Sequence, residues 1–354
     1  MRIDADIRLA PMAGFTNAPA RVVALEFGAT AVYTEMAGVE GLVHEKSDET
    51  WQLLETLPEE AGRVYAHLYG SEPEHFARAA EKVAATGRFI GIDINAGCPV
   101  PKVTACGAGS ALMRDPAKIG RIVAAARKAS GLPVSVKTRI GFGPSEITVF
   151  DVLGEVEAAG GTSLAVHGRY KPQGHAGEVH FGIVSELKRR AHIPVFGNGG
   201  VRDAADAAEY LGKTAVDGLL VGQASIGHPW VFKEISEGRV FEPSAGHSSY
   251  LDLAEIRRVL FAHIDREYAF ASYIARKYPL SAPDYSPEAI AAIRFRVHLF
   301  RYLAGLKGSS YMRGRMASLQ TVDDCRRAVE GCLECERRYR ARRGIPNEHQ
   351  RERL

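Results

Sequence analysis

Eight short runs of apolar, β-favouring residues follow one another through the first 240 residues, at intervals of roughly 25 to 40 residues. Their sequences are IRLAPM, ATAVYTEM, VYAHLYG, FIGIDIN, PVSVKTRI, SLAVHGR, IPVFGNGG and DGLLVGQ. Most are followed by a stretch with helical periodicity, such as residues 116–130 and 203–212. Apolar strands that alternate with helices are typical of a parallel sheet covered on both faces. Eight such units predict an α/β fold of the (β/α)8, or TIM, barrel type, which we favour over an open doubly wound sheet.

The pattern changes after the eighth run. Residues 236–250 are rich in Gly, Ser and Pro and predict a linker. Three helical stretches follow it, at residues 250–270, 286–306 and 321–343. We therefore expect a barrel domain over residues 1–240, an all-α helical domain over 246–340 and a basic tail over 341–354.

Charge is shared unevenly between these regions. The formal net charge of +3 divides into −3 for residues 1–240 (25 Lys+Arg, 28 Asp+Glu) and +6 for residues 241–354 (20 and 14). A local basic excess favours a partner with many phosphates. No apolar run approaches the length of a membrane span, and the N-terminus lacks a signal-peptide core. We expect a cytoplasmic monomer with no membrane partner.

The five cysteines do not suggest a disulfide framework in a chain of 354 residues. Cys325, Cys332 and Cys335 offer three thiols with no fourth ligand at a familiar spacing, so we predict no metal site. Cys98 stands apart because it lies between a glycine and a proline at the end of an apolar run. Either Cys98 is a small buried residue in a tight turn, or it is placed for chemistry.

Polar residues and glycines gather at the carboxyl ends of the runs, where a (β/α)8 barrel builds its active site. The third to sixth runs contribute His67, then Asn95 and Cys98, then Lys137 and Arg139, and then His167 and Arg169. Any one of these could be a turn residue or a helix cap, but together they favour a functional site.

The ends of the seventh and eighth runs point to a ligand with a phosphate group. Asn198, Gly199 and Gly200 follow one strand, and Gly222 and Gln223 follow the next. Exposed backbone N–H groups before a helix bind phosphate, and this barrel often holds a phosphate after strands 7 and 8. FMN fits such a site, and Lys137 could stabilise negative charge on its reduced ring.

Several blocks of this sequence resemble the tRNA-dihydrouridine synthases. They are LAPMAGFTN, TEM, GSEP, DINAGCPVPKV with GAGSALM, VKTRIGF, VHGR, IPVFGNGGV and DGLLVGQASIGHPWVF. The similarity covers the barrel and, more loosely, the helical region. It implies an FMN-containing (β/α)8 barrel with a C-terminal RNA-binding helical domain, which reduces uridine in tRNA with NADPH or NADH as reductant.

The resemblance also implies roles for individual residues. It assigns a uracil contact to Asn95 and proton donation to Cys98. It places Pro11, Met12, Ala13, His67, Lys137 and His167 against the flavin, and Asn198, Gly199, Gly200, Gly222 and Gln223 at its phosphate. We add Lys102 and Arg169 as substrate-binding residues. Three positions depart from the family pattern, with Asn17 in place of Asp, His67 in place of Gln and Gln223 in place of Arg.

The implied chemistry accounts for the thiol. Reduction of the uracil C5=C6 bond needs a hydride at C6, which the flavin supplies, and a proton at C5 from a general acid. A neutral thiol can give this proton and be reprotonated afterwards. We therefore interpret Cys98 as the catalytic acid.

The substrate uridine must be flipped out of folded RNA, which costs a few kcal/mol that phosphate contacts could offset. Residues 289–320 carry six basic residues and no acidic one. We expect Arg294 and Arg301 to bind RNA on one helix face with His298, and Tyr302 and Tyr311 to be available for stacking. Helical spacing predicts that the opposite face turns to the core, with Ile290, Ile293, Val297, Phe300 and Ala304.

Two other functions remain open. An FMN barrel could act on a free small molecule, which leaves the basic helical region unexplained. A non-catalytic RNA-binding protein would leave Cys98, Lys137 and His167 without a role, and bound yellow flavin would exclude it. The sequence does not reveal which uridine is modified or whether NADPH or NADH is preferred.

Overall fold

The computed structural model describes residues 3–44, 48–238, 252–279 and 285–344. Most of the expected linker and the end of the expected tail, residues 345–354, lie outside the described residues. Residues 341–343 form the end of the last helix, not a separate tail.

The eight predicted runs form the strands of one parallel sheet. They are β1 (Asp6–Leu9), β2 (Val32–Tyr33), β4 (Val64–Tyr69), β5 (Gly91–Ala96), β6 (Val134–Arg139), β9 (Ser163–His167), β10 (Val195–Asn198) and β11 (Gly218–Val221). Their order is β1-β11-β10-β9-β6-β5-β4-β2, and β3 (Ala37–Gly38) also pairs with β4. A small antiparallel pair, β7 (Gly141–Gly143) with β8 (Glu146–Ile147), stands outside this sheet.

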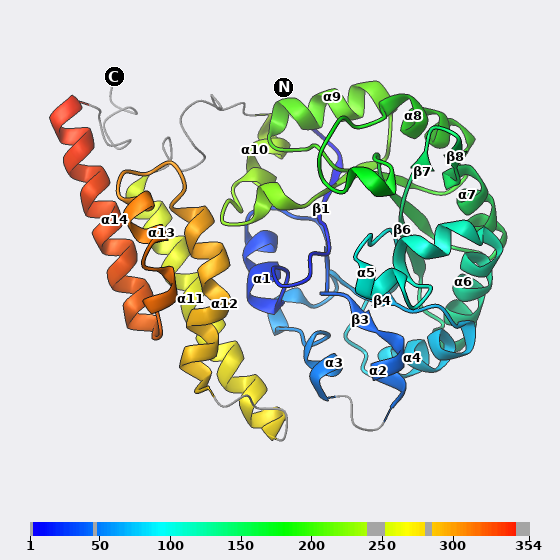
Figure 1. The fold of residues 1–354 in the computed structure, drawn as a ribbon, viewed down its shortest axis with the longest axis horizontal. Helices are drawn as coiled ribbons and strands as arrows, with labels where there is room; N and C mark the ends of the chain where they lie inside the picture. The colour runs from blue at the N-terminus through cyan, green and yellow to red at the C-terminus, as the bar shows by residue number, and fades with distance from the viewer. Residues whose placement is uncertain (1–2, 45–47, 239–251, 280–284, 345–354) are drawn as a thin grey trace. The chain divides into compact units, whose positions relative to one another are not determined.

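Backbone hydrogen bonds close the sheet into a barrel. The Leu9 N–H donates to the carbonyl of Ala31 at 3.0 Å, and the Thr30 N–H donates to the carbonyl of Ile7 at 2.9 Å. These bonds join β1 to the start of β2, the two ends of the strand order. The predicted (β/α)8 fold is therefore confirmed, and Figure 1 shows its helices around the outside of the sheet.

Some helices of this unit begin at a residue whose side chain caps the N-terminus. The helices of the unit are α1 (Ala18–Glu26), α2 (Val39–Val43), α3 (Asp48–Gln52), α4 (Pro73–Ala85), α5 (Pro101–Thr104), α6 (Pro116–Ser130), α7 (Val149–Ala158), α8 (Phe181–Arg190), α9 (Ala204–Thr214) and α10 (Val231–Glu237). In α6, the Asp115 side chain caps the N-terminus by accepting from Lys118 N–H. Gly131 ends the same helix in the left-handed region, at φ +66°.

A second compact unit contains α11 (Leu253–Lys277), α12 (Pro287–Tyr302), α13 (Ser309–Arg313) and α14 (Val322–Arg343). The segment Ser225–Trp230, which follows β11, belongs to this helical unit and not to the barrel unit. Its Gly227 packs so closely on α12 that a Cβ atom there would lie 2.4 Å from the Tyr302 nitrogen. No described helix is long and apolar enough to cross a membrane.

The prediction of which face of α12 packs against the core is wrong. Ile293 and Val297 are 37% and 39% exposed, whereas His298 and Tyr302 are buried. Apolar residues occupy both faces of this helix, so periodicity alone could not choose between them. The buried face is the one on which Tyr302 can place its hydroxyl 3.1 Å from His263 Nδ1.

The RNA prediction for α12 therefore holds only in part. Arg294 and Arg301 are exposed, as expected. Tyr302 and His298 are enclosed in the helical unit, so the prediction that Tyr302 stacks on a base is wrong. The side chain of Tyr311 lies outside what the structure describes.

Candidate active site

Five strands of the barrel carry predicted functional side chains toward the same edge. These residues are His67 on β4, Asn95 on β5, Lys137 on β6, His167 on β9 and Asn198 on β10. The strand register pairs Asn95 with Lys137 and His167 with Asn198. Because the strands are parallel, their carboxyl ends form one rim. The structure thus brings these five predicted residues together.

Cys98 lies in a tight turn after β5 and is half-buried. The Asn95 side-chain oxygen accepts hydrogen bonds from the Gly97 and Cys98 N–H groups, at 3.1 and 2.9 Å. The Cys98 carbonyl accepts a bond from Ser110 N–H at 3.0 Å. A Cβ atom on Gly109 would lie 2.7 Å from that carbonyl, which explains the glycine there. The thiol therefore stands on a turn held from both sides.

Arg139, at the end of β6, is a further part of this turn. Its Nε donates to the Gly97 carbonyl at 2.9 Å, and its NH1 donates to the Gly174 carbonyl at 2.8 Å. The side chain is buried, and burial lowers the pKa of Arg139 to about 10. Arg139 thus ties the Cys98 turn to the loop that follows β9.

Lys137, on β6, is one of the residues that the resemblance places against the flavin. Burial, followed by repulsion from Arg139, lowers the pKa of Lys137 to about 8. Asp93 and Cys98 act in the opposite direction on that pKa. The Lys137 amine is thus mostly protonated at neutral pH, and an anion that binds beside it would stabilise its charged form.

His167 is buried at the end of β9 and is neutral. Burial lowers its pKa far below the ordinary value, and the charges of Lys137, Arg139 and Arg169 lower it further. Arg169 NH1 lies 3.1 Å from His167 Nε2. Because a guanidinium can only donate, Nε2 accepts this bond and the ring proton is on Nδ1. His175 also lies near, with ring centroids 5.7 Å apart.

The turn after β10 has the backbone that the glycine pattern predicted. Gly199 and Gly200 both have positive φ, at +95° and +81°. A Cβ atom on Gly199 would lie 2.4 Å from the His167 ring. The Asp203 side chain caps α9, so a phosphate here depends on the glycine N–H groups more than on the helix terminus.

The ends of β10 and β11 are joined by Asn198, whose Nδ2 donates to the Leu220 carbonyl at 2.7 Å. Gly222 lies beyond β11, and a Cβ atom there would lie 3.6 Å from Met12 Sδ. Gln223 is exposed and begins a single 3₁₀ turn, η4 (Gln223–Ser225), not an α-helix. The second predicted phosphate contact therefore presents fewer aligned N–H groups than the sequence suggested.

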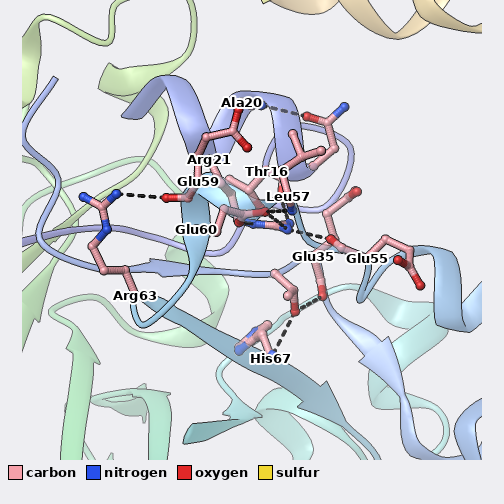
Figure 2. Close-up of polar contacts among 12 residues, drawn as sticks. Thr16, Ala20, Arg21, Glu35, Glu55, Leu57, Glu59, Glu60, Arg63 and His67 are labelled. Atoms are coloured by element: carbon pink, nitrogen blue, oxygen red, sulfur yellow. Dashed lines mark hydrogen bonds and ion pairs between the residues drawn. The ribbon is translucent and has the colours of Figure 1, made fainter. Parts of the chain in front are cut away.

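A buried ion pair stabilises the loop after β1, which contains Pro11, Met12 and Ala13. Thr16 Oγ accepts a bond from Met12 N–H at 3.0 Å, and the Thr16 carbonyl accepts one from Arg21 NH1 at 2.8 Å. Arg21 forms an ion pair with Glu60, and neither side chain is exposed. Figure 2 shows Arg21 together with Thr16 and Glu60. This network fixes the loop that the resemblance places against the flavin.

Hydrogen bonds also connect the loop after β1 to the end of β2 and to β4, and Figure 2 labels two of the residues involved, Glu35 and His67. The Glu35 carboxylate accepts a hydrogen bond from Gly14 N–H at 2.6 Å. Thr34 Oγ donates to the Glu35 carbonyl and accepts from the His67 N–H, both at 2.9 Å. The rim is therefore a connected framework before any ligand is considered.

Three predicted substrate contacts are not carried by these five strands. Lys102 is exposed on α5, four residues after Cys98. Arg294 and Arg301 belong to the helical unit. Arg169, by contrast, lies within the rim, where its Nε donates to the Gly177 carbonyl at 2.9 Å.

The donor set of the rim fits a phosphorylated flavin. Lys137, Arg139 and Arg169 repel one another closely enough to lower the pKa values of neighbouring groups. An anionic ligand would relieve that repulsion, and the glycine N–H groups after β10 can bind its phosphate. Among the described residues, no cluster of His, Cys, Asp and Glu is arranged to hold a metal ion.

Sequence reasoning overlooked Asp93 and Ser135, and it placed Arg139 at a strand end without giving it a role. Asp93 lies two positions before Asn95, and Ser135 lies two positions before Lys137, so each is on the same strand face as a predicted residue. This period of two could have revealed them.

Comparison with known proteins identifies the family. The family model "Dihydrouridine synthase (Dus)" matches residues 8–334. The tRNA-dihydrouridine synthase B of Pseudomonas aeruginosa is 32% identical and covers 89% of each chain. That of Pseudomonas putida is 33% identical and covers 88% of this chain and 86% of its own.

More distant matches agree with this result or add little to it. A probable tRNA-dihydrouridine synthase of Mycobacterium leprae is 31% identical and covers 89% of this chain and 85% of its own. Among solved structures, an old yellow enzyme homologue from Zymomonas mobilis has a TM-score of 0.46 at 12% identity, covering 67% and 90%. That likeness is too slight to support an argument. From the family match and these relatives, we conclude that the chain belongs to the dihydrouridine synthase family.

Proposed function

We propose that this protein reduces a uridine of tRNA to 5,6-dihydrouridine with Cys98 as the proton donor. Membership of the family makes the chain an FMN-dependent oxidoreductase. The observation that carries the residue assignment is the position of Cys98, half-buried on a fixed turn beside the rim. Five strand ends there supply the groups that would hold the cofactor.

A side chain of the protein would supply the proton that is added to C5 of the uracil. Bound FMN supplies the hydride that is added to C6 of the uracil. The thiol of Cys98 then gives its proton to C5, and the S–H bond breaks as the C5–H bond forms. The resulting thiolate regains a proton from solvent, which a half-buried side chain can reach.

Other rim residues hold the cofactor and control charge. Protonated Lys137 would face the negative charge that develops on the reduced ring, and neutral His167 would donate from Nδ1. The Gly199 and Gly200 N–H groups would bind the phosphate. Either NADPH or NADH would restore the reduced cofactor.

The tRNA partner would be held by exposed basic side chains. Arg294 and Arg301 stand exposed on α12, and contacts from them to phosphates would offset the cost of flipping the base. A tRNA substrate also fits our expectation of a cytoplasmic location.

The function is tested with purified protein, an unmodified tRNA transcript and NADPH or NADH. We expect bound yellow flavin, and dihydrouridine in the digested tRNA only when the reductant is present, as measured by mass spectrometry. Free uridine and small enones serve as matched substrates. Turnover of these small molecules without reduction of tRNA would favour an FMN barrel for small substrates, and absence of flavin would exclude both enzyme functions.

A further inference from the structure

A chain of buried hydrogen bonds runs behind the Cys98 turn. Ser135 Oγ donates to Asp93 Oδ1 at 2.6 Å, and Asp93 Oδ2 lies 2.6 Å from His67 Nδ1. His67 Nε2 lies 3.1 Å from Asn95 Nδ2. All four side chains are at most 7% exposed. The chain therefore links β6, β5 and β4 inside the barrel.

Each member of this chain dictates the role of the next. The N–H groups of Gly97 and Cys98 both point to one atom of the Asn95 amide, so that atom is the oxygen and the amide nitrogen faces His67 Nε2. An NH2 group only donates, so Nε2 accepts and the ring hydrogen is on Nδ1, where it is donated to Asp93 Oδ2.

The amide oxygen of Asn95 is the atom that holds the turn. It accepts from the N–H groups of Gly97 and Cys98, at 3.1 and 2.9 Å. If the amide were reversed, its NH2 group would face two backbone donors, and both would lose their acceptor. Buried donors without acceptors are costly, so the turn would rearrange.

We propose that His67 and Asp93 are positioning residues for the catalytic thiol. They fix the orientation of the Asn95 amide, and Asn95 in turn fixes the backbone that carries Cys98. This role differs from the flavin contact that the resemblance implied for His67. The importance of this role for catalysis rests on the proposed function of Cys98. The hydrogen bonds themselves are present in the protein without cofactor or substrate.

The test compares His67→Leu with His67→Gln. Leucine removes both ring nitrogens, whereas glutamine keeps one donor for Asp93 and one acceptor for Asn95. The readout is amide hydrogen exchange at Gly97 and Cys98, which are the only exchangeable amides between Ala96 and Val100 because Pro99 has none. We expect His67→Leu to lower protection there by about tenfold, and His67→Gln to keep it within about twofold.

Thiol alkylation gives a second readout on the same samples. Cys106 is exposed and serves as an internal reference for the rate at Cys98. We expect His67→Leu to change the ratio of the two rates by at least about threefold. The matched control is His75→Leu, which breaks an exposed His–Glu pair of the same 2.6 Å length and should change neither readout.

His67→Leu strands the buried carboxylate of Asp93, and the variant could fail to fold. In that case the double variant His67→Leu/Asp93→Leu, which removes the carboxylate, carries the same test. Unchanged amide protection and an unchanged alkylation ratio in either folded variant would overturn the proposal. Weaker FMN binding with both readouts intact would also overturn it, by assigning His67 to the cofactor. Both readouts are taken without tRNA, so failure to form dihydrouridine would refute the proposed function and leave this inference standing.

Discussion

The rim of the barrel and the interior of the helical unit both bury a neutral histidine, but the two histidines have different neighbours. Burial lowers the pKa of His167 in the rim, and three neighbouring cations lower it further. Burial likewise lowers the pKa of His263 in the helical unit to about 3, with repulsion from one cation, Arg266, as a second cause. There, Nδ1 lies 3.1 Å from the Tyr302 hydroxyl and Nε2 lies 3.5 Å from a Glu267 oxygen. Like charges gathered in one place favour a ligand site, whereas internal pairs favour a packed core.

The cysteines of the two units also differ in their surroundings. Cys98 is half-buried on a turn that hydrogen bonds hold in place. Cys332 is 2% exposed in the helical unit, and burial raises its pKa to about 12. A residue type therefore says little about function until its surroundings are known. Four predictions test this difference between the rim and the helical unit.

The largest expected effect is on chemistry at the rim. Cys98→Ala should lower the rate of dihydrouridine formation by at least about a hundredfold, because a general acid contributes at least that much. FMN content and oxidation of NADPH in the absence of tRNA should remain near wild type. Single-turnover reduction of tRNA by the prereduced enzyme is the measurement.

Cys332→Ala is the matched control from the helical unit. It should leave the rate of tRNA reduction unchanged and lower the stability of the fold by about 1 kcal/mol through lost packing. If Cys98→Ala retained the wild-type rate, the rim thiol would be no more functional than the buried one.

The second effect concerns RNA binding by the surface of the helical unit. Arg294→Glu with Arg301→Glu should weaken tRNA binding by more than about tenfold at low salt, and should reduce the slope of log affinity against log salt by about two. Binding is measured at several salt concentrations, with flavin absorbance read on the same samples. A wild-type slope would show that these exposed arginines are only solvated and that tRNA is held elsewhere.

The third effect is acid sensitivity of the helical unit. The folded protein keeps His263 neutral down to about pH 3, whereas the unfolded chain takes up a proton below the ordinary pKa of 6.5. Stability from this residue is therefore present above pH 6.5 and is lost as the pH falls toward 3, by up to about 1.4 kcal/mol per pH unit. Denaturant unfolding at pH 7, 6 and 5 measures it.

His263→Phe should reduce the slope of stability against pH by up to about 1.4 kcal/mol per pH unit, even if it lowers the stability at pH 7. His44→Phe, at an exposed histidine of the barrel unit, should leave the dependence unchanged. The same slope in both variants would mean that the acid sensitivity arises elsewhere, with buried His167 of the rim as the next residue to test.

The smallest effect concerns the phosphate end of the rim. Gln223→Arg should tighten FMN binding by up to about tenfold, because it adds a charge-assisted hydrogen bond to the phosphate. Gln223 is exposed, so the longer side chain meets no steric obstacle from burial. A flavin titration of both proteins gives the result, and unchanged or weaker affinity would place the phosphate away from the end of β11.

Much of this architecture followed from local sequence patterns. Strand-length apolar runs gave all eight barrel strands, because period and length are properties of a few neighbouring residues. Gly199 and Gly200 marked a turn, and both have the positive φ that glycine adopts without a steric penalty. The Cys98 turn is also local, since Asn95 binds the N–H groups two and three residues later.

Only the tertiary structure decided which distant groups meet. His67 and Asp93 are 26 residues apart in sequence, and strand register places them side by side. Arg139 donates a hydrogen bond to the carbonyl of Gly174, which lies in a loop whose conformation the periodicity of the sequence does not predict. The buried face of α12 was likewise chosen by its partners on α11, because apolar residues on both faces left the helix without a preference of its own. Propensity and periodicity act over a few residues, whereas a buried polar group is satisfied by whatever the fold brings to it.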